Sequence, residues 1–138
     1  MATLLLVAAC GGSISTAPST LNIQGTWNFS DAVSNTALAV SCQSTRTGKL
    51  SQLGSTFSIL VSNGTQVCTQ NGSVDFDLSG FSGGQINGTD LSFVDDSGCN
   101  YTGTISGSPP NRLWGVESCT LALSGVQYIF LGTWQASR

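Results

Sequence analysis

The chain of 138 residues is long enough for one domain with a hydrophobic core, and it combines 40% hydrophobic residues with only 8% charged residues. Its net charge is −3, and it has no cluster of Lys or Arg. This argues against nucleic acid as a partner and against adsorption to anionic lipid through a basic face. The absence of histidine excludes His-based catalysis and most zinc sites.

The N-terminus carries an apolar run that ends in Val7-Ala8-Ala9-Cys10. These four residues resemble the lipobox of bacterial lipoproteins, in which small residues precede a cysteine that becomes lipidated. The run is too short to span a bilayer. We interpret residues 1–9 as a lipoprotein signal peptide. No Lys or Arg precedes the apolar run, which implies either that the start is mis-assigned or that the basic start is lost. The alternative is an apolar N-terminus without a function.

The lipobox resemblance implies that the mature chain begins at a lipidated Cys10. Residues 10–20 are then the lipidated cysteine and a flexible tether of small polar residues, and residues 21–138 form the folded domain. Gly11 follows the cysteine where Asp would retain the protein in the inner membrane. For a Gram-negative lipoprotein this implies the outer membrane, with the domain facing the periplasm or the cell surface.

Apolar residues after position 20 recur at every second position in short segments, which predicts β-strands separated by tight turns. The first strand is expected at 22–30, with Ile23, Gly25, Trp27 and Phe29 on one face. A second strand ends near Cys42, a turn is expected at 46–49, and a strand broken at Gly54 follows at 50–61. The Asn63-Gly64 pair predicts a hairpin turn before a short strand at 67–68.

The second half of the chain follows the same pattern. Asn71-Gly72 predicts a turn, 74–78 a strand, and the glycine-rich stretch 80–84 a break. Asn87-Gly88 predicts another hairpin turn, 91–93 a strand and 95–98 a turn. The last strand, 126–136, follows a turn at Ser124-Gly125 and places Tyr128, Phe130, Gly132 and Trp134 on one face.

The segment from Cys99 to Cys119 predicts a hairpin closed by a disulfide. A turn centred on Pro109 places Cys99 directly opposite Cys119 and Tyr101 opposite Glu117. Of the five cysteines, Cys10 is assigned to lipidation, and the hairpin register then leaves Cys42 to pair with Cys68. An oxidising compartment follows from this framework. The alternatives are free buried thiols and, less favoured, a site with four cysteines around a metal.

The same three residues occur at both ends of the domain, as Gly25-Thr26-Trp27 and Gly132-Thr133-Trp134. Antiparallel pairing of the first and last strands would close a barrel and bring both Trp side chains inside. We therefore predict an all-β fold, an antiparallel up-and-down (meander) β-barrel of about eight to ten strands, because short turns favour a meander and closure removes exposed edges. The alternative is a two-sheet β-sandwich.

Two resemblances support a barrel. Gly25-x-Trp27 together with Arg138 resembles the lipocalin pattern, in which that Trp packs at the barrel base near an Arg from the end of the final strand; the lipocalin Thr-Asp-Tyr triplet is absent. The closest similarity is to a family of small bacterial lipoproteins with a lipocalin-like barrel and no assigned activity. It rests on the lipobox, the arm at 99–107 (Cys-x-Tyr-Thr-Gly-Thr-x-Ser-Gly) and the terminal Gly-Thr-Trp-x-Ala-x-Arg at 132–138.

No catalytic, metal or cofactor site is predicted. Gly80-Phe-Ser82-Gly-Gly84 matches a nucleophile-elbow pattern, but that motif needs a strand-to-helix turn and a His base. The concentration of acids at Asp75, Asp77 and 90–96 reads as a solvated face and turn residues rather than a Ca²⁺ loop.

Aromatic side chains are the remaining candidates for a binding site. A barrel of about eight strands either fills with side chains or holds one small apolar ligand. The sequence therefore predicts a non-catalytic, lipid-anchored envelope barrel that binds a small apolar ligand, or alternatively a structural or interaction module with a solid core. Trp114 is expected to point outward as a contact residue. The candidate ligand-binding residues are Trp27, Phe29, Tyr101, Tyr128, Phe130 and Trp134.

Overall fold

A computed structural model describes residues 21–69, 72–74 and 80–138 of the chain. The expected signal peptide, Cys10, the tether and most of the strand expected at 74–78 lie outside these residues. Nine strands occur in the described part: β1 (Gly25–Asn35), β2 (Val40–Leu53), β3 (Thr56–Cys68), β4 (Gly72–Val74), β5 (Phe81–Asn87), β6 (Asp90–Val94), β7 (Asn100–Ser106), β8 (Arg112–Leu123) and β9 (Val126–Ser137).

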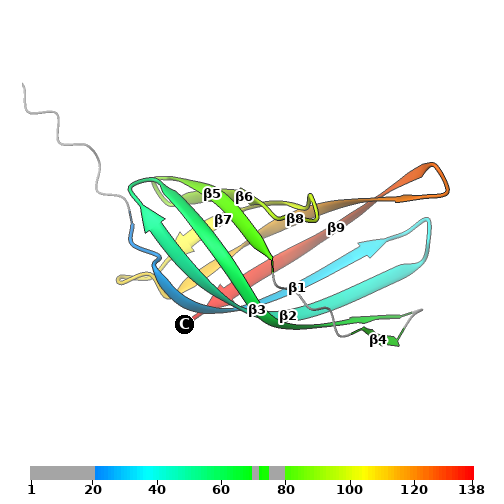
Figure 1. Cartoon of the computed structure of the whole chain (residues 1–138), viewed down its shortest axis with the longest axis horizontal. Coiled ribbons are helices and arrows are strands. Elements are labelled where there is room, and N and C mark those ends of the chain that lie inside the picture. The colour runs from blue at the N-terminus through cyan, green and yellow to red at the C-terminus, as the bar shows by residue number, and fades with distance from the viewer. Residues whose placement is uncertain (1–20, 70–71, 75–79) are drawn as a thin grey trace, which may run out of the picture.

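The strands form one closed antiparallel sheet (Figure 1). Each strand pairs with the next along the chain, except that β3 pairs with β4 along one half and with β5 along the other. β1 then pairs with β9, so eight strands close into an up-and-down barrel and β4 stays outside the ring. The predicted all-β meander barrel is confirmed, and the described strands do not divide into the two sheets of a sandwich.

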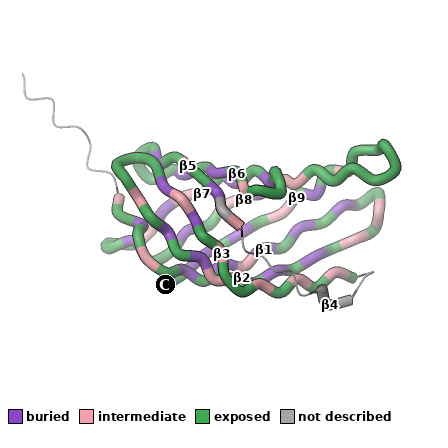
Figure 2. The backbone as a smooth tube through the Cα atoms, viewed as in Figure 1, coloured by how far each residue is buried: buried purple, intermediate pink, exposed green. Residues whose placement is uncertain are grey.

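The first and last strands meet as the repeated Gly-Thr-Trp residues predicted. β1 and β9 are antiparallel, with Phe29 opposite Ala136 and Asp31 opposite Trp134. Side chains of β1 alternate between the two faces of the sheet, which gives the banded burial along this strand in Figure 2. The predicted inward face of the first strand is confirmed, because Ile23, Trp27 and Phe29 are all buried.

Both predicted disulfides are present, each joining neighbouring strands. Cys99 bonds Cys119 with a Cα–Cα distance of 4.2 Å, and Tyr101 lies opposite Glu117 in the predicted register of β7 and β8. Cys42 bonds Cys68 with a Cα–Cα distance of 4.1 Å and joins β2 to β3. Figure 1 marks the C-terminus at one end of the barrel, which we call the base; the opposite end is the far end. Both bonds lie toward the far end, because Cys42 is opposite Val33 near the end of β1 and Cys119 is opposite Phe130 near the start of β9.

Two predicted breaks are wrong, since the residues lie inside strands. The turn expected at 46–49 is the middle of β2, and the break expected at 80–84 is mostly β5. The glycines there provide room for aromatic rings instead of bending the chain. A Cβ on Gly48 would approach Phe29 Cε2 to 2.8 Å, and a Cβ on Gly84 would overlap the ring of Phe57.

The hairpin expected at Asn63-Gly64 is also wrong, because these residues form a β-bulge within β3. Asn63 has a φ of +58°, and opposite the step from Arg46 to Thr47 the pairing partner changes from Gly64 to Ser62. One extra residue reverses which side chains face inward. Phe57 and Ile59 face the interior before the bulge, and Cys68 reaches the same face after it, where Cys42 lies.

Deletion of Asn63 is therefore expected to abolish the Cys42–Cys68 bond. Without the extra residue Cys68 turns to the outer face, and the fold loses the roughly 2–4 kcal/mol that a disulfide contributes. Intact mass after alkylation of free thiols should show two more modified cysteines than the natural chain shows. The control Asn63→Gly keeps a residue suited to positive φ and should keep both bonds. Complete disulfide formation in the deletion variant would show that the bulge does not set the inward face.

Candidate functional site

Stacked aromatic rings fill the part of the barrel interior between the base and the polar residues described below. Phe93 and Tyr101 stack face to face with ring centroids 4.4 Å apart, and Trp134 meets Phe93 edge-on at 5.4 Å. Phe29 stacks on the other side of Trp134, with centroids 6.4 Å apart. The Trp134 indole N–H donates to the carbonyl of Thr102 at 3.1 Å. These contacts hold each ring in one orientation.

Trp27 and Arg138 close the base of the barrel. Trp27 is fully buried, and its indole N–H donates to the carbonyl of Ile23 at 2.8 Å. The Arg138 guanidinium lies over this indole, with Cζ 4.6 Å from the ring centroid, and donates to the carbonyls of Pro110 and Gln24. The arginine that directly follows the last strand therefore packs against the first-strand Trp.

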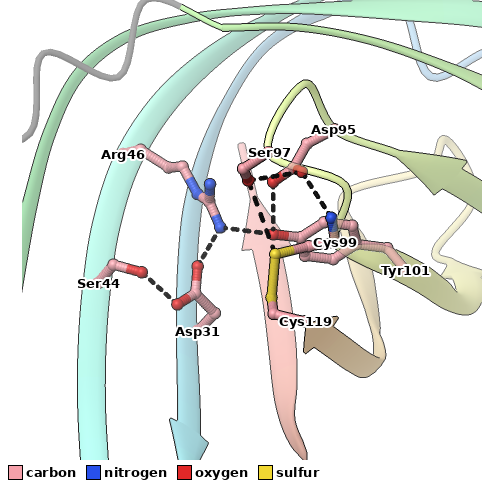
Figure 3. The surroundings of a disulfide bond; sticks show 8 residues. All are labelled: Asp31, Ser44, Arg46, Asp95, Ser97, Cys99, Tyr101 and Cys119. Carbon is pink, nitrogen blue, oxygen red and sulfur yellow. Dashed lines mark hydrogen bonds and ion pairs between the residues drawn. A yellow bond between two sulfur atoms is a disulfide. The ribbon is translucent and has the colours of Figure 1, made fainter. Parts of the chain in front are cut away.

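A polar layer lies next to the aromatic rings on the side of the far end, because Asp31 follows Phe29 on the same face of β1. Figure 3 shows its hydrogen bonds and ion pair. The Asp31 carboxylate accepts hydrogen bonds from the Ser44 hydroxyl and from the Arg46 guanidinium, with which it forms an ion pair. Arg46 Nη2 also donates to the Tyr101 hydroxyl at 3.1 Å. The layer thus connects β1, β2 and β7 across the interior.

The Tyr101 hydroxyl extends the polar layer to the loop between β6 and β7. It donates to Asp95 Oδ2 at 3.1 Å, while Asp95 Oδ1 accepts from the Ser97 hydroxyl at 2.7 Å and from the Cys99 amide at 2.9 Å. Asp95 therefore fixes the loop that precedes the Cys99–Cys119 disulfide. The sequence predicted only a turn role for Asp95, and the structure adds its bonds to Tyr101 and Cys99.

Burial and neighbouring charges shift the pKa values of this layer. Burial acts to lower the pKa of Arg46, but Tyr101 and Asp31 outweigh it, so the pKa rises and the guanidinium stays charged. Burial raises the pKa of Tyr101 above its usual range; Arg46 opposes this, and the charges of Glu117 and Asp95 add to it. Tyr101 therefore remains a neutral donor at any physiological pH.

Glu117 also belongs to the polar layer, and one of its carboxyl oxygens has no hydrogen-bond partner among the described residues. Its side chain faces inward from β8, the residue is 4% exposed, and its buried Oε2 has no hydrogen-bond partner among the described residues. Burial, followed by repulsion from Asp31, raises its pKa to about 8, which Arg46 only partly offsets. At neutral pH the group is therefore mostly protonated.

Very little empty space remains between the rings and the polar layer. The cavity bordered by Phe29, Asp31, Arg46, Tyr101 and Trp134 measures about 20 Å³. A single water needs roughly 10–15 Å³ measured in this way. The interior at this level therefore has room for one water and not for an organic ligand, unless side chains move.

The structure brings together four of the six candidate ligand-binding residues. Trp27, Phe29, Tyr101 and Trp134 belong to the main core, whereas Phe130 packs in a second cluster at the far end with Val33 and Cys42, and Tyr128 lies against it. The predicted outward orientation of Trp114 is confirmed by its 49% exposure.

Sequence reasoning missed the inward position of three charged residues, Asp31, Arg46 and Glu117. The signal for Asp31 was present, because it follows Trp27 and Phe29 at period two. Glu117 was already expected opposite Tyr101, and that register implies an inward side chain. Arg46 could not be found while residues 46–49 were assigned to a turn.

The hydrogen bonds of the polar layer hold strands and the loop before β7 in place, and Glu117 keeps one proton at neutral pH. Among the residues that the structure describes, no group of three or more Cys, Asp or Glu is placed to hold a metal ion. In the same residues, no helix is long and apolar enough to cross a membrane.

Comparison with known proteins adds one structural neighbour. No family model matches the chain, and no curated protein matches it. A de novo designed fluorescence-activating β-barrel is similar in structure at 11% sequence identity, with a TM-score of 0.39, over 80% of this chain and 90% of the designed one.

Replacement of Glu117 by Gln is expected to change how stability depends on pH. The folded-state pKa of about 8 lies above the usual glutamate value of 4.5, so the folded protein keeps a proton that the unfolded chain releases between these pH values. Stability of the natural protein should therefore fall as pH rises from about 4.5 to about 8. Glu117→Gln should flatten this slope and stabilise the protein at pH 8.

Urea unfolding at pH 5, 6.5 and 8 measures the slope. The exposed acid Asp90 provides a control, since Asp90→Asn should leave the slope unchanged. An equally steep slope in Glu117→Gln would contradict the assignment of the proton to this carboxyl.

Removal of the Arg46 charge is expected to destabilise the barrel. Arg46→Met leaves Asp31 buried without its ion-pair partner, which should cost about 3–5 kcal/mol in the free energy of unfolding. The same change at the exposed Arg112 should cost less than about 0.5 kcal/mol. Denaturant unfolding of both variants makes the comparison, and equal effects would argue against a structural role for the ion pair.

Proposed function

We propose that this protein is a non-catalytic, lipid-anchored module of the bacterial envelope that acts through its outer surface, with a barrel interior made solid by side chains. The observation that carries this proposal is the cavity of about 20 Å³ between the aromatic rings and the polar layer. A barrel without room for a ligand works as a rigid scaffold for contacts made outside it.

The cysteines support the envelope location. All four cysteines of the domain are paired in two disulfides, as expected in an exported protein. Cys10 is the remaining cysteine, and it ends the lipobox-like sequence. In this proposal its lipid anchors the domain to the outer membrane, facing the periplasm or the cell surface.

A small apolar ligand inside the barrel is the second candidate. A closed barrel with a buried aromatic cluster is compatible with ligand binding, and Tyr101 and Trp134 border the remaining space. Binding would require the stacked rings to separate, which costs their mutual contacts. We therefore favour the solid barrel.

The absence of an enzymatic role is part of the proposal. The described acids nearest to an active-site pattern are already engaged, since Asp31 bonds Ser44 and Arg46 while Asp95 bonds Ser97, Cys99 and Tyr101. A carboxylate held in this way serves the fold rather than a substrate.

The proposal is tested by native and denaturing mass spectrometry of the chain after expression in an oxidising compartment. We expect the same mass per chain in both spectra, lower than the fully reduced mass by four hydrogens for two disulfides. A mass excess seen only in the native spectrum would mean a retained ligand and would favour the second candidate.

A further inference from the structure

The last two strands extend beyond the barrel wall as a two-stranded ribbon. β8 pairs with β7 only as far as Ser118, and β9 pairs with β1 only as far as Leu131. Beyond these residues β8 and β9 pair only with each other as far as the turn at Ser124-Gly125. We call residues 119–130 the ribbon; it projects at the far end of the barrel (Figure 1) and is largely exposed (Figure 2).

The ribbon and the adjoining wall carry an unusual amount of exposed apolar surface. No charged residue occurs between Glu117 and Arg138. Isolated two-stranded ribbons are marginally stable, and exposed apolar strand edges without charges are prone to pair with other strands. The apolar side chains here, each between 43% and 61% exposed, are Trp114, Val116, Leu121, Leu123, Val126, Ile129 and Leu131.

The two edges of the ribbon differ in their hydrogen bonding. Ser124 and Gly125 both have positive φ, 51° and 80°, which is typical of a two-residue hairpin turn. In such a hairpin Leu123 and Val126 share the first bonded pair, so the backbone groups of Ala122 and Thr120 on β8, and of Gln127 and Ile129 on β9, point outward. The Asn35 side-chain amide donates to the Ile129 carbonyl at 2.8 Å, which agrees with this pattern.

The β8 edge of the ribbon is the more open of the two, although Gln127 and the Ile129 amide on the β9 edge also lack a backbone partner outside the ribbon among the described residues. On the β9 edge Asn35 occupies the Ile129 carbonyl. On the β8 edge the outward amides and carbonyls of Thr120 and Ala122 have no backbone partner in the part of the chain that the structure describes. Open backbone groups beside apolar side chains form a template for another strand.

We propose that two copies of this chain associate through the open β8 edge, which continues the sheet from one barrel into the other. The proposal rests on the proposed function, because it names a partner for the outer surface. A two-fold axis pairs identical edges in antiparallel orientation. Centred on Leu121, it places Thr120 opposite Ala122 of the second copy, so the outward backbone groups of both residues bond each other.

The chemistry of the ribbon favours a second copy over other occupants. The chain carries net charge −3, and two copies repel one another least where they meet through an uncharged segment. Lipid is a poor partner, since open strand edges are not tolerated in hydrocarbon, where their backbone groups stay unpaired. Pairing with the same edge of a second copy satisfies these groups and covers Leu121 on both sides.

The oligomeric state of the full chain, carrying Cys10→Ser so that no lipid contributes, tests this proposal. Light scattering after gel filtration, on oxidised protein at about 100 µM, should give twice the chain mass of 14.2 kDa. A monomer at this concentration would overturn the proposal. This outcome is independent of the mass-spectrometric search for a ligand, so the two proposals fail separately.

Two matched pairs of substitutions then locate the interface. Ala122→Pro removes an outward N–H from the β8 edge, and Gln127→Pro does the same on the β9 edge directly opposite. Neither removes a bond within the ribbon. We expect Ala122→Pro to weaken the dimer at least about tenfold and Gln127→Pro to leave it unchanged; the reverse result would contradict an interface at β8.

The lysine pair keeps the backbone intact, so it remains informative if a proline variant fails to fold. Ala122→Lys should weaken dimerisation by placing charges from both copies close together, and Gln127→Lys should not. A dimer equally stable in both lysine variants would overturn the proposed edge.

Discussion

The structure depends on the pairing of β1 with β9, because that contact turns a meander of strands into a closed ring. Once the barrel is closed, the inward side chains must fill a fixed volume. An aromatic side chain on one strand then needs a small residue nearby on another strand. Gly48 admits Phe29, Gly84 admits Phe57, and Gly103 admits the indole of Trp134. Closure thus explains why these glycines occur in the middle of strands, each beside an aromatic ring.

The polar layer divides this filled interior into two parts. Arg46 donates hydrogen bonds to both Asp31 and Tyr101, so the burial of these groups is compensated, whereas the Oε2 atom of Glu117 is buried without a described partner. Gly64 lies opposite Arg46 beside the Asn63 bulge, and the same bulge turns Cys68 inward. A local irregularity in β3 therefore accompanies both the buried ion pair and the disulfide of the far end.

Much of the fold could be predicted from the sequence, because period-two alternation and turn chemistry are local signals. The register of β7 with β8 and both disulfides followed from one turn and the cysteine spacing. Asn63-Gly64 misled the prediction because a residue pair suited to positive φ serves a bulge as well as a hairpin. Glycine placement misled it at Gly48 and Gly84, because close packing against a ring from another strand is not visible along the chain.

The most direct test of a solid interior is the hydrogen exchange of the Trp27 and Trp134 indole N–H groups, followed by NMR. Both indoles are buried and hydrogen-bonded to carbonyls of the chain. If side chains fill the interior and exclude water, both protons exchange only through global unfolding. The free energy of opening obtained from their exchange rates then equals the free energy of unfolding. Fast exchange of Trp134 under native conditions would reveal a water-accessible cavity and contradict the solid barrel.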